Sequence, residues 1–140
     1  MLLPNGTVFA IVDGEKFELY RNSGSETEPR LEAMPVPDLE ATNYSAGVRE
    51  HDRISRFPTE TAKNRVARLD EAGHAAAVAR WLNARVLAHE FDRLVLIADP
   101  RSLGEMRRHF HKEVDRVLTA EVPKNLTGRP AMEIVRVLHG

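Results

Sequence analysis

Two aspartates follow directly after apolar runs that the sequence predicts to be buried strands. Asp13 follows residues 7–12, and Asp99 follows residues 94–98. In a metal-dependent nuclease, carboxylates placed in this way hold two divalent ions that clamp the scissile phosphate. A helix acid such as Glu60 or Glu71 could complete the set of ligands. The sequence therefore raises a nuclease hypothesis in which Asp13 and Asp99 are the catalytic residues.

Each aspartate also has a local explanation. Asp13-Gly14 is typical of a tight hairpin turn. Asp99-Pro100 is typical of a helix N-terminus. The aspartate accepts hydrogen bonds from the free N–H groups of the first turn, and proline fits the first helical position because the N–H that it lacks would have no partner there. We favour these local roles, so we predict no catalytic residue, no metal site and no cofactor, and we keep the nuclease as the alternative.

Basic residues form the second group of candidate functional residues. The candidate binding residues follow the second apolar run: Arg101, Arg107, Arg108, His111 and Lys112. Such a set could contact RNA phosphates, although a cluster of charges is usually just a solvated helix face. The whole chain has 20 basic and 21 acidic residues, a net charge of −1, which gives no general attraction to nucleic acid or to a membrane surface.

His109 and His111 invite a metal hypothesis. Two residues apart on a helix means a rotation of about 200°, so the two rings cannot hold one ion there. A helix break near His111 would reopen that geometry. No acidic partner has a suitable spacing, and we expect both to be surface histidines.

Composition excludes several other classes. The chain has 140 residues and no cysteine, so we expect a single domain over residues 1–140 without disulfides or thiol chemistry. No phosphate-binding glycine loop and no Gly-X-Ser-X-Gly elbow is present. The first residues lack the pattern of an export signal, and no apolar run reaches the roughly 18 residues that cross a bilayer. We therefore expect a cytoplasmic protein.

Hydrophobic periodicity predicts the elements that position these residues. Strands are predicted near 8–13, 16–21, 31–36, 94–98 and 117–122, the first three as an antiparallel meander. A long loop is predicted from 38 to 60. A helix follows to about residue 90, with Val66, Leu69, Val78, Leu82 and Val86 on its apolar face and a break at Gly73 left open. Further helices are predicted over 101–116 and from Pro130.

This order predicts an α/β fold with a five-stranded mixed sheet. Three antiparallel strands precede two β-α-β crossovers, and right-handed crossovers place strand 94–98 beside the first strand. Only these two strands are apolar on both faces, so 94–98 is expected inside the sheet. Helices on both faces would give the three layers of a ribonuclease H-like arrangement.

Several segments resemble one protein family. They are Phe91 to Arg107 (FDRLVLIADPRSLGEMR), His111 to Val114, Lys124 to Pro130, and the hairpin Ile11-Val12-Asp13-Gly14. Together they resemble the host attachment family, the "protein required for attachment to host cells". The resemblance implies distant kinship with the middle domain of eukaryotic and archaeal peptide-release factors, and a ribonuclease H-like fold.

The resemblance transfers no catalytic residue. Where the family usually has an acid, this sequence has Asn125, so no role built on that acid carries over. What it implies is a non-catalytic binding or adaptor domain, with the ribosome or RNA as the partner to consider.

Overall fold

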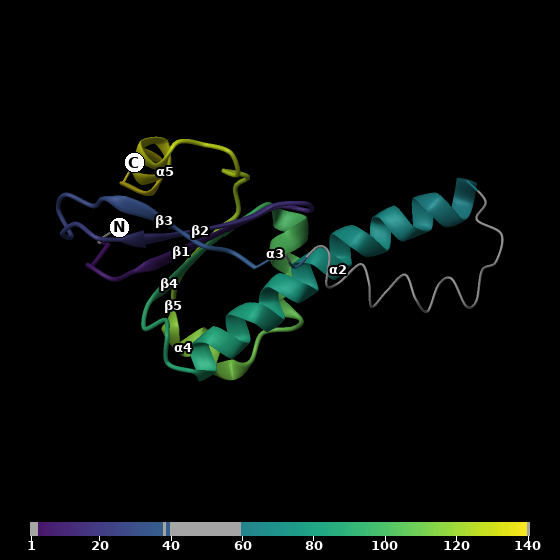
Figure 1. Ribbon diagram of the computed structural model, residues 1–140, viewed down its shortest axis with the longest axis horizontal. Helices are drawn as coiled ribbons and strands as arrows, with labels where there is room; N and C mark the ends of the chain where they lie inside the picture. Colours follow the sequence, from purple (N-terminus) through teal and green to yellow (C-terminus); the bar gives the residue numbers. More distant parts are fainter. Residues whose placement is uncertain (1–2, 38, 40–59, 140) are drawn as a thin grey trace.

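The computed structural model describes residues 3–37, 39 and 60–139, and within the long helix it describes side chains from Glu71 onward. The elements follow the predicted order (Figure 1). The strands are β1 (Val8–Val12), β2 (Phe17–Asn22), β3 (Leu31–Met34), β4 (Leu94–Ala98) and β5 (Leu118–Val122). The helices are α2 (Glu60–Leu87), α3 (Pro100–Arg107), α4 (Lys112–Val117) and α5 (Ala131–His139). The predicted loop at 38–60, apart from its residues 39 and 60, and the side chains of Val66 and Leu69 lie outside the described residues.

The five strands form one mixed sheet in the order β3-β2-β1-β4-β5. β2 pairs antiparallel with β1 and β3, whereas β4 pairs parallel with β1 and β5. The strand at 94–98 is therefore inside the sheet and beside the first strand, as predicted. β1 and β4 are buried at every position. This arrangement confirms the predicted α/β class, and it fits the ribonuclease H-like expectation.

Helices cover both faces of this sheet (Figure 1). Successive side chains of a strand point to opposite faces, and β1 shows the consequence. Val8, Ala10 and Val12 pack in the core shared with α2, α3 and α4. Phe9 and Ile11 pack in the core shared with α5. The result is the predicted three-layer arrangement.

The long helix α2 packs its apolar face on the sheet. Val78, Leu82 and Val86 are buried against β1 and β4, as predicted. The helix runs without interruption from Glu60 to Leu87, so Gly73 does not divide it. Helix packing of this kind supplies most of the stability of a single helix in a protein.

The strand predicted at 31–36 is shorter in the structure. β3 ends at Met34, and Pro35 follows. Proline cannot donate a ladder hydrogen bond, which is why it ends a strand or stays at a sheet edge. β3 is also the outermost strand on its side of the sheet.

The single helix predicted over 101–116 is wrong, because the structure has α3 and α4 with a break between them. Asn83 of α2 stabilises the break. Its Nδ2 donates to the carbonyl of His109 at 2.8 Å, and its Oδ1 accepts from the backbone N–H of His111 at 2.8 Å. The imidazole of His111 then accepts from the N–H of Glu113 at 3.1 Å and caps α4. These bonds satisfy the backbone groups that a helix end leaves free.

Candidate functional site

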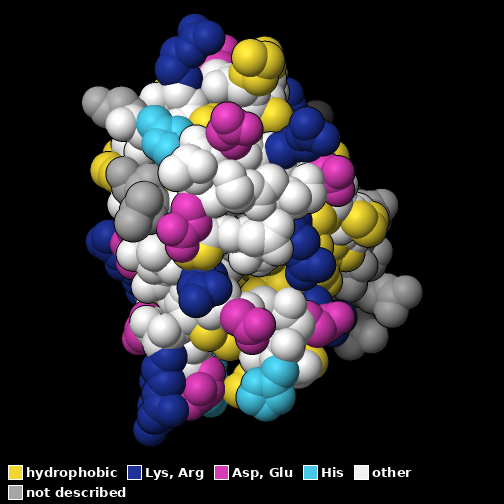
Figure 2. All heavy atoms as spheres, turned by 90° about the vertical axis from the view of Figure 1, so that its left-hand side faces the viewer, with side chains coloured by type: hydrophobic (Ala, Val, Ile, Leu, Met, Phe, Trp, Pro, Cys, Tyr) yellow, Lys and Arg dark blue, Asp and Glu magenta, His cyan; other side chains and the backbone are white. Residues whose placement is uncertain are grey.

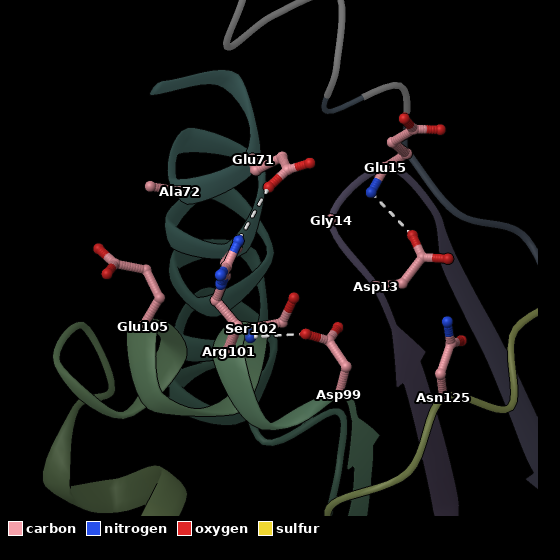
Figure 3. Close-up of a pocket in the computed structure, with 11 residues that line it drawn as sticks. Asp13, Gly14, Glu15, Glu71, Ala72, Asp99, Arg101, Ser102, Glu105 and Asn125 are labelled. Atoms are coloured by element: carbon pink, nitrogen blue, oxygen red, sulfur yellow. Dashed lines mark hydrogen bonds and ion pairs between the residues drawn. The ribbon is translucent and has the colours of Figure 1, made fainter. Parts of the chain in front are cut away.

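The ends of β1 and β4 bring Asp13 and Asp99 to the rim of one pocket. Val12 and Ala98 are partners in the parallel register, so the two aspartates that follow them leave the sheet side by side. Both line a pocket of about 730 Å³ (Figure 3). From β1 the chain continues to β2 on one side of the pocket, and from β4 it continues to β5 on the other, so the strand order reverses between β1 and β4. In open α/β sheets, the crevice at such a point is the usual place for a ligand.

Both carboxylate oxygens of Asp13 accept hydrogen bonds. Oδ1 accepts from the backbone N–H groups of Glu15 and Lys16 at 2.7 Å and 2.5 Å. Oδ2 accepts from the Thr127 hydroxyl at 2.7 Å. The residue is therefore the hairpin-turn aspartate that the Asp-Gly pair predicted, with an added bond from the far end of the chain.

The electrostatics of Asp13 agree with this bonding. Burial raises the pKa of its carboxyl group, but the hydrogen bonds from Thr127, Glu15 and Lys16 and the nearby His74 outweigh burial and hold the pKa below its ordinary value. His74 is buried in α2, and its Nδ1 lies 3.1 Å from the Asp13 carbonyl oxygen. The carboxylate of Asp13 is thus held in its ionised form and bonds the hairpin to the 123–128 segment, while the backbone carbonyl of the same residue contacts α2.

Asp99 has the predicted capping role, with one oxygen left over. Its Oδ2 accepts from the backbone N–H of Ser102 at 3.1 Å and caps α3, and Pro100 occupies the first helical turn. Its Oδ1 is buried and has no hydrogen-bond partner among the described residues. The cap therefore accounts for one of the two carboxylate oxygens.

The carboxylates around the pocket do not form a metal site within the described residues. No group of three or more His, Asp or Glu side chains there could hold an ion. Glu71 lines the pocket, but its Oε2 lies 4.0 Å from Arg101 Nη1. The side chain of Glu60, the other acid of the nuclease hypothesis, lies outside the described residues.

The pocket carries an excess of negative charge. Its charged lining residues are one arginine and five acids, namely Arg101, Asp13, Glu15, Glu71, Asp99 and Glu105. Such a lining attracts cationic groups and repels phosphate. A nucleic-acid backbone is therefore a poor occupant of this pocket unless metal ions come with it.

Thr127 is a site residue that sequence reasoning missed, and Asn125, which the sequence marked only as the position of a family acid, lies beside it. The Thr127 hydroxyl lies 2.7 Å from both Asp13 Oδ2 and Asn125 Oδ1, and its backbone N–H donates to Asn125 Oδ1 at 3.2 Å. Gly128, at φ +77°, donates its N–H to Glu18 Oε1 at 2.6 Å. An Asn-X-Thr-Gly sequence is a sign of such a side-chain-stabilised turn, but nothing in it indicates the partner on the β1–β2 hairpin.

The predicted basic binding residues lie along α3 and at the start of α4. Arg101 is exposed, and its Nη1 lies 4.0 Å from Glu71 Oε2. Arg107 donates from Nε and Nη2 to one carboxylate oxygen of Glu121 in β5. Arg108 lies 3.5 Å from Glu105.

His111 and Lys112 complete the predicted set. Both are exposed, and neither forms an ion pair with a described side chain. His111 caps α4, whereas His109 lies 3.3 Å from Glu105 Oε1. The two histidines thus have separate partners, and neither joins a metal-binding group among the described residues.

None of the described helices is long and apolar enough to cross a membrane. The sequence model of bacterial archaeo-eukaryotic release factor family 12 matches residues 6–138 of the chain. No curated protein matches it. The family match confirms the kinship with release factors that the resemblance implied, and its description does not refer to host attachment.

Proposed function

This chain belongs to the bacterial archaeo-eukaryotic release factor family 12, and we propose that it is a non-catalytic binding domain that associates with the ribosome through RNA. Family membership over residues 6–138 is the observation that carries the proposal. A ribosome-bound role would place the protein in the cytoplasm. The resemblance to host attachment proteins adds no chemistry of its own.

The basic residues of α3 and α4 are the proposed RNA contacts. Arg108 is 76% exposed, and its pair with Glu105 at 3.5 Å is the kind of surface ion pair that contributes little and exchanges readily. His111 and Lys112 are exposed beside it. Phosphate oxygens could therefore bind these side chains without breaking a buried contact.

Arg101 and Arg107 differ in how readily their side chains can bind a phosphate. Arg101 lines the acidic pocket and lies 4.0 Å from Glu71, but its side chain is 88% exposed, so we assign it to a phosphate outside that pocket. Arg107 would have to give up both of its bonds to Glu121, whose side chain is 24% exposed. We therefore propose that Arg107 mainly holds α3 against β5, and that Arg101, Arg108 and Lys112 contact RNA.

The nuclease alternative has less support. Both oxygens of Asp13 already accept hydrogen bonds, and the carboxylates that line the pocket with Asp99 repel phosphate. A two-metal site must hold ions roughly 4 Å apart with several convergent carboxylates. RNA binding by the basic segment requires no such site.

Co-sedimentation with purified bacterial ribosomes through a sucrose cushion tests the proposal. We expect the wild-type protein to pellet with ribosomes and with purified ribosomal RNA at low salt, and to be released at high salt. Replacing Arg108 and Lys112 by glutamate should lower the salt slope by about one for each phosphate that the variant no longer binds. Arg30→Glu with Arg136→Glu is the matched control, because it makes the same charge change in residues that line a different pocket, beside α5.

Pelleting that survives ribonuclease treatment of the ribosomes would show that RNA is not the binding partner. An equal decrease for the two double variants would show that general charge, rather than the α3–α4 segment, governs the association. Either result would overturn the proposal.

A further inference from the structure

Another pocket lies between the edge strand β3 and the helix α5, on the α5 face of the sheet. Its volume is about 480 Å³. Leu31 of β3 and Val135 of α5 form its apolar floor, together with Ala131. Met132 and two arginines, Arg30 and Arg136, complete the lining with Pro29. We call this the β3–α5 groove.

Met132 is exposed at the groove to an unusual degree for a large apolar side chain. It is 76% exposed, whereas its neighbours on α5, Ile134 and Leu138, are buried in the core. Figure 2 views this side of the molecule, and at the top hydrophobic surface lies between Lys and Arg side chains, with Asp and Glu side chains also beside it. Exposed apolar surface with a polar rim is typical of an interaction site, and methionine adapts its shape to a partner.

The charge of the groove has one sign. The charged residues among its lining are both arginines, Arg30 and Arg136. Both are exposed, and neither forms an ion pair with a described acid. A partner that fits this groove must therefore combine an apolar group with negative charge on both sides.

Three other occupants fit these features less well. Strand addition along β3 is limited, because the strand has four residues and is followed by Pro35. The groove has no aromatic lining residue on which a nucleic-acid base could stack. A symmetric pair of two copies would bring the arginines of one groove against those of the other.

We propose that the β3–α5 groove binds a peptide segment of a partner protein in which an apolar anchor is flanked by carboxylates. The anchor packs on Leu31, Val135 and Met132, and the carboxylates pair with Arg30 and Arg136. This surface lies on the α5 face of the sheet, whereas the helices that carry the proposed RNA contacts pack on the other face. The groove and the RNA contacts can therefore be tested separately.

Selection from a random twelve-residue peptide library displayed on phage, using the full-length protein as bait, tests this inference. We expect the selected peptides to share a leucine, isoleucine or phenylalanine flanked by Asp or Glu. Labelled versions of the best peptide should bind the wild-type protein at least about fivefold more tightly than a copy with Lys in place of each acid. Amide shifts in an NMR titration should map to β3 and α5.

Three variants make the test specific. Arg30→Glu with Arg136→Glu should reverse the preference, so that the Lys copy binds more tightly than the acidic peptide. Met132→Ser should weaken binding of the acidic peptide about tenfold. The melting temperature of this variant should stay close to that of the wild type, because the side chain of Met132 is exposed. Arg108→Glu with Lys112→Glu, on the opposite layer, should leave peptide binding unchanged.

Selected peptides without enriched acids, or shifts that map elsewhere, would overturn the inference. A wild-type dimer in light scattering that Met132→Ser converts to a monomer would also overturn it, since a second copy would then cover the groove.

Discussion

Asp13 joins three parts of the molecule, two through its carboxylate and one through its backbone carbonyl. Its oxygens accept from the hairpin amides of Glu15 and Lys16 and from the hydroxyl of Thr127, which lies 114 positions further along the chain. The carbonyl oxygen of the same residue contacts His74 of α2. All of these bonds to the carboxylate favour its ionised form.

The lowered pKa of Asp13 predicts how stability depends on pH. Because the folded-state pKa lies below the ordinary value of 3.8, the carboxylate contributes its stabilisation above that value and loses it as pH falls through the folded-state pKa. We expect Asp13→Asn to cost about 1 kcal/mol of unfolding free energy at neutral pH, and the difference from wild type to shrink below about pH 4. Denaturant melts across this range would measure it.

Asp92→Asn is the control for the removal of one negative charge, since Asp92 is exposed. Its unfolding free energy should match that of wild type at neutral pH. A constant gap between wild type and Asp13→Asn down to acid pH would show that the ionised form of Asp13 contributes nothing.

At the scale of elements, α2 fixes the geometry of the molecule. It packs on the sheet through Val78, Leu82 and Val86, and its Asn83 bonds the junction between α3 and α4. Trp81 extends the same packing to Phe17 and Phe91, with ring centroids 5.6 Å and 6.0 Å apart. The positions of the basic residues on α3 and α4 therefore depend on this helix.

Leu82→Ala should measure how much that packing contributes. Leu82 is fully buried, so the truncation leaves a cavity and should cost about 2–5 kcal/mol of unfolding free energy. Leu87→Ala on the same helix is the matched control, since Leu87 is 49% exposed and should cost less than about 0.5 kcal/mol. Similar costs for the two variants in denaturant melts would mean that the packed face of α2 has been misassigned.

At the scale of the whole molecule, three surfaces differ in character. The strand-end pocket is acidic, the α3–α4 segment carries exposed basic residues, and the β3–α5 groove on the α5 face is apolar with a cationic rim. The described part of the chain thus presents surfaces of different chemistry on the two faces and at the strand ends of its sheet. Binding requires only that each surface be accessible, whereas catalysis would require the carboxylates to converge on a reacting group.

We predict that the purified protein does not hydrolyse RNA or DNA in the presence of Mg²⁺ or Mn²⁺. Both oxygens of Asp13 accept hydrogen bonds, and the described residues contain no cluster of three metal ligands. Labelled oligonucleotides incubated with wild type and with Asp13→Asn/Asp99→Asn should remain intact in both cases. Cleavage by wild type that the double variant loses would establish the nuclease instead.

The sequence by itself determined the elements and their main neighbours. The runs of β1 and β4 are apolar at every position, which requires a strand covered on both faces, and two such strands belong side by side. The roles of Asp13 and Asp99 as turn and cap follow from Gly14 and Pro100, because those bonds are made within three residues along the chain. Local chemistry of this kind is readable without the fold.

Only the tertiary structure decided the contacts between distant residues. The apolar spacing of 101–116 continues through the break, so periodicity alone predicted one helix, and the break depends on Asn83, which belongs to another helix. The bond from Thr127 to Asp13, the pair of Arg107 with Glu121 and the β3–α5 groove arise in the same way. Periodicity records which face of an element is buried, but it does not record which distant residue will lie against that face, and these contacts exist only once the sheet and its helices are packed.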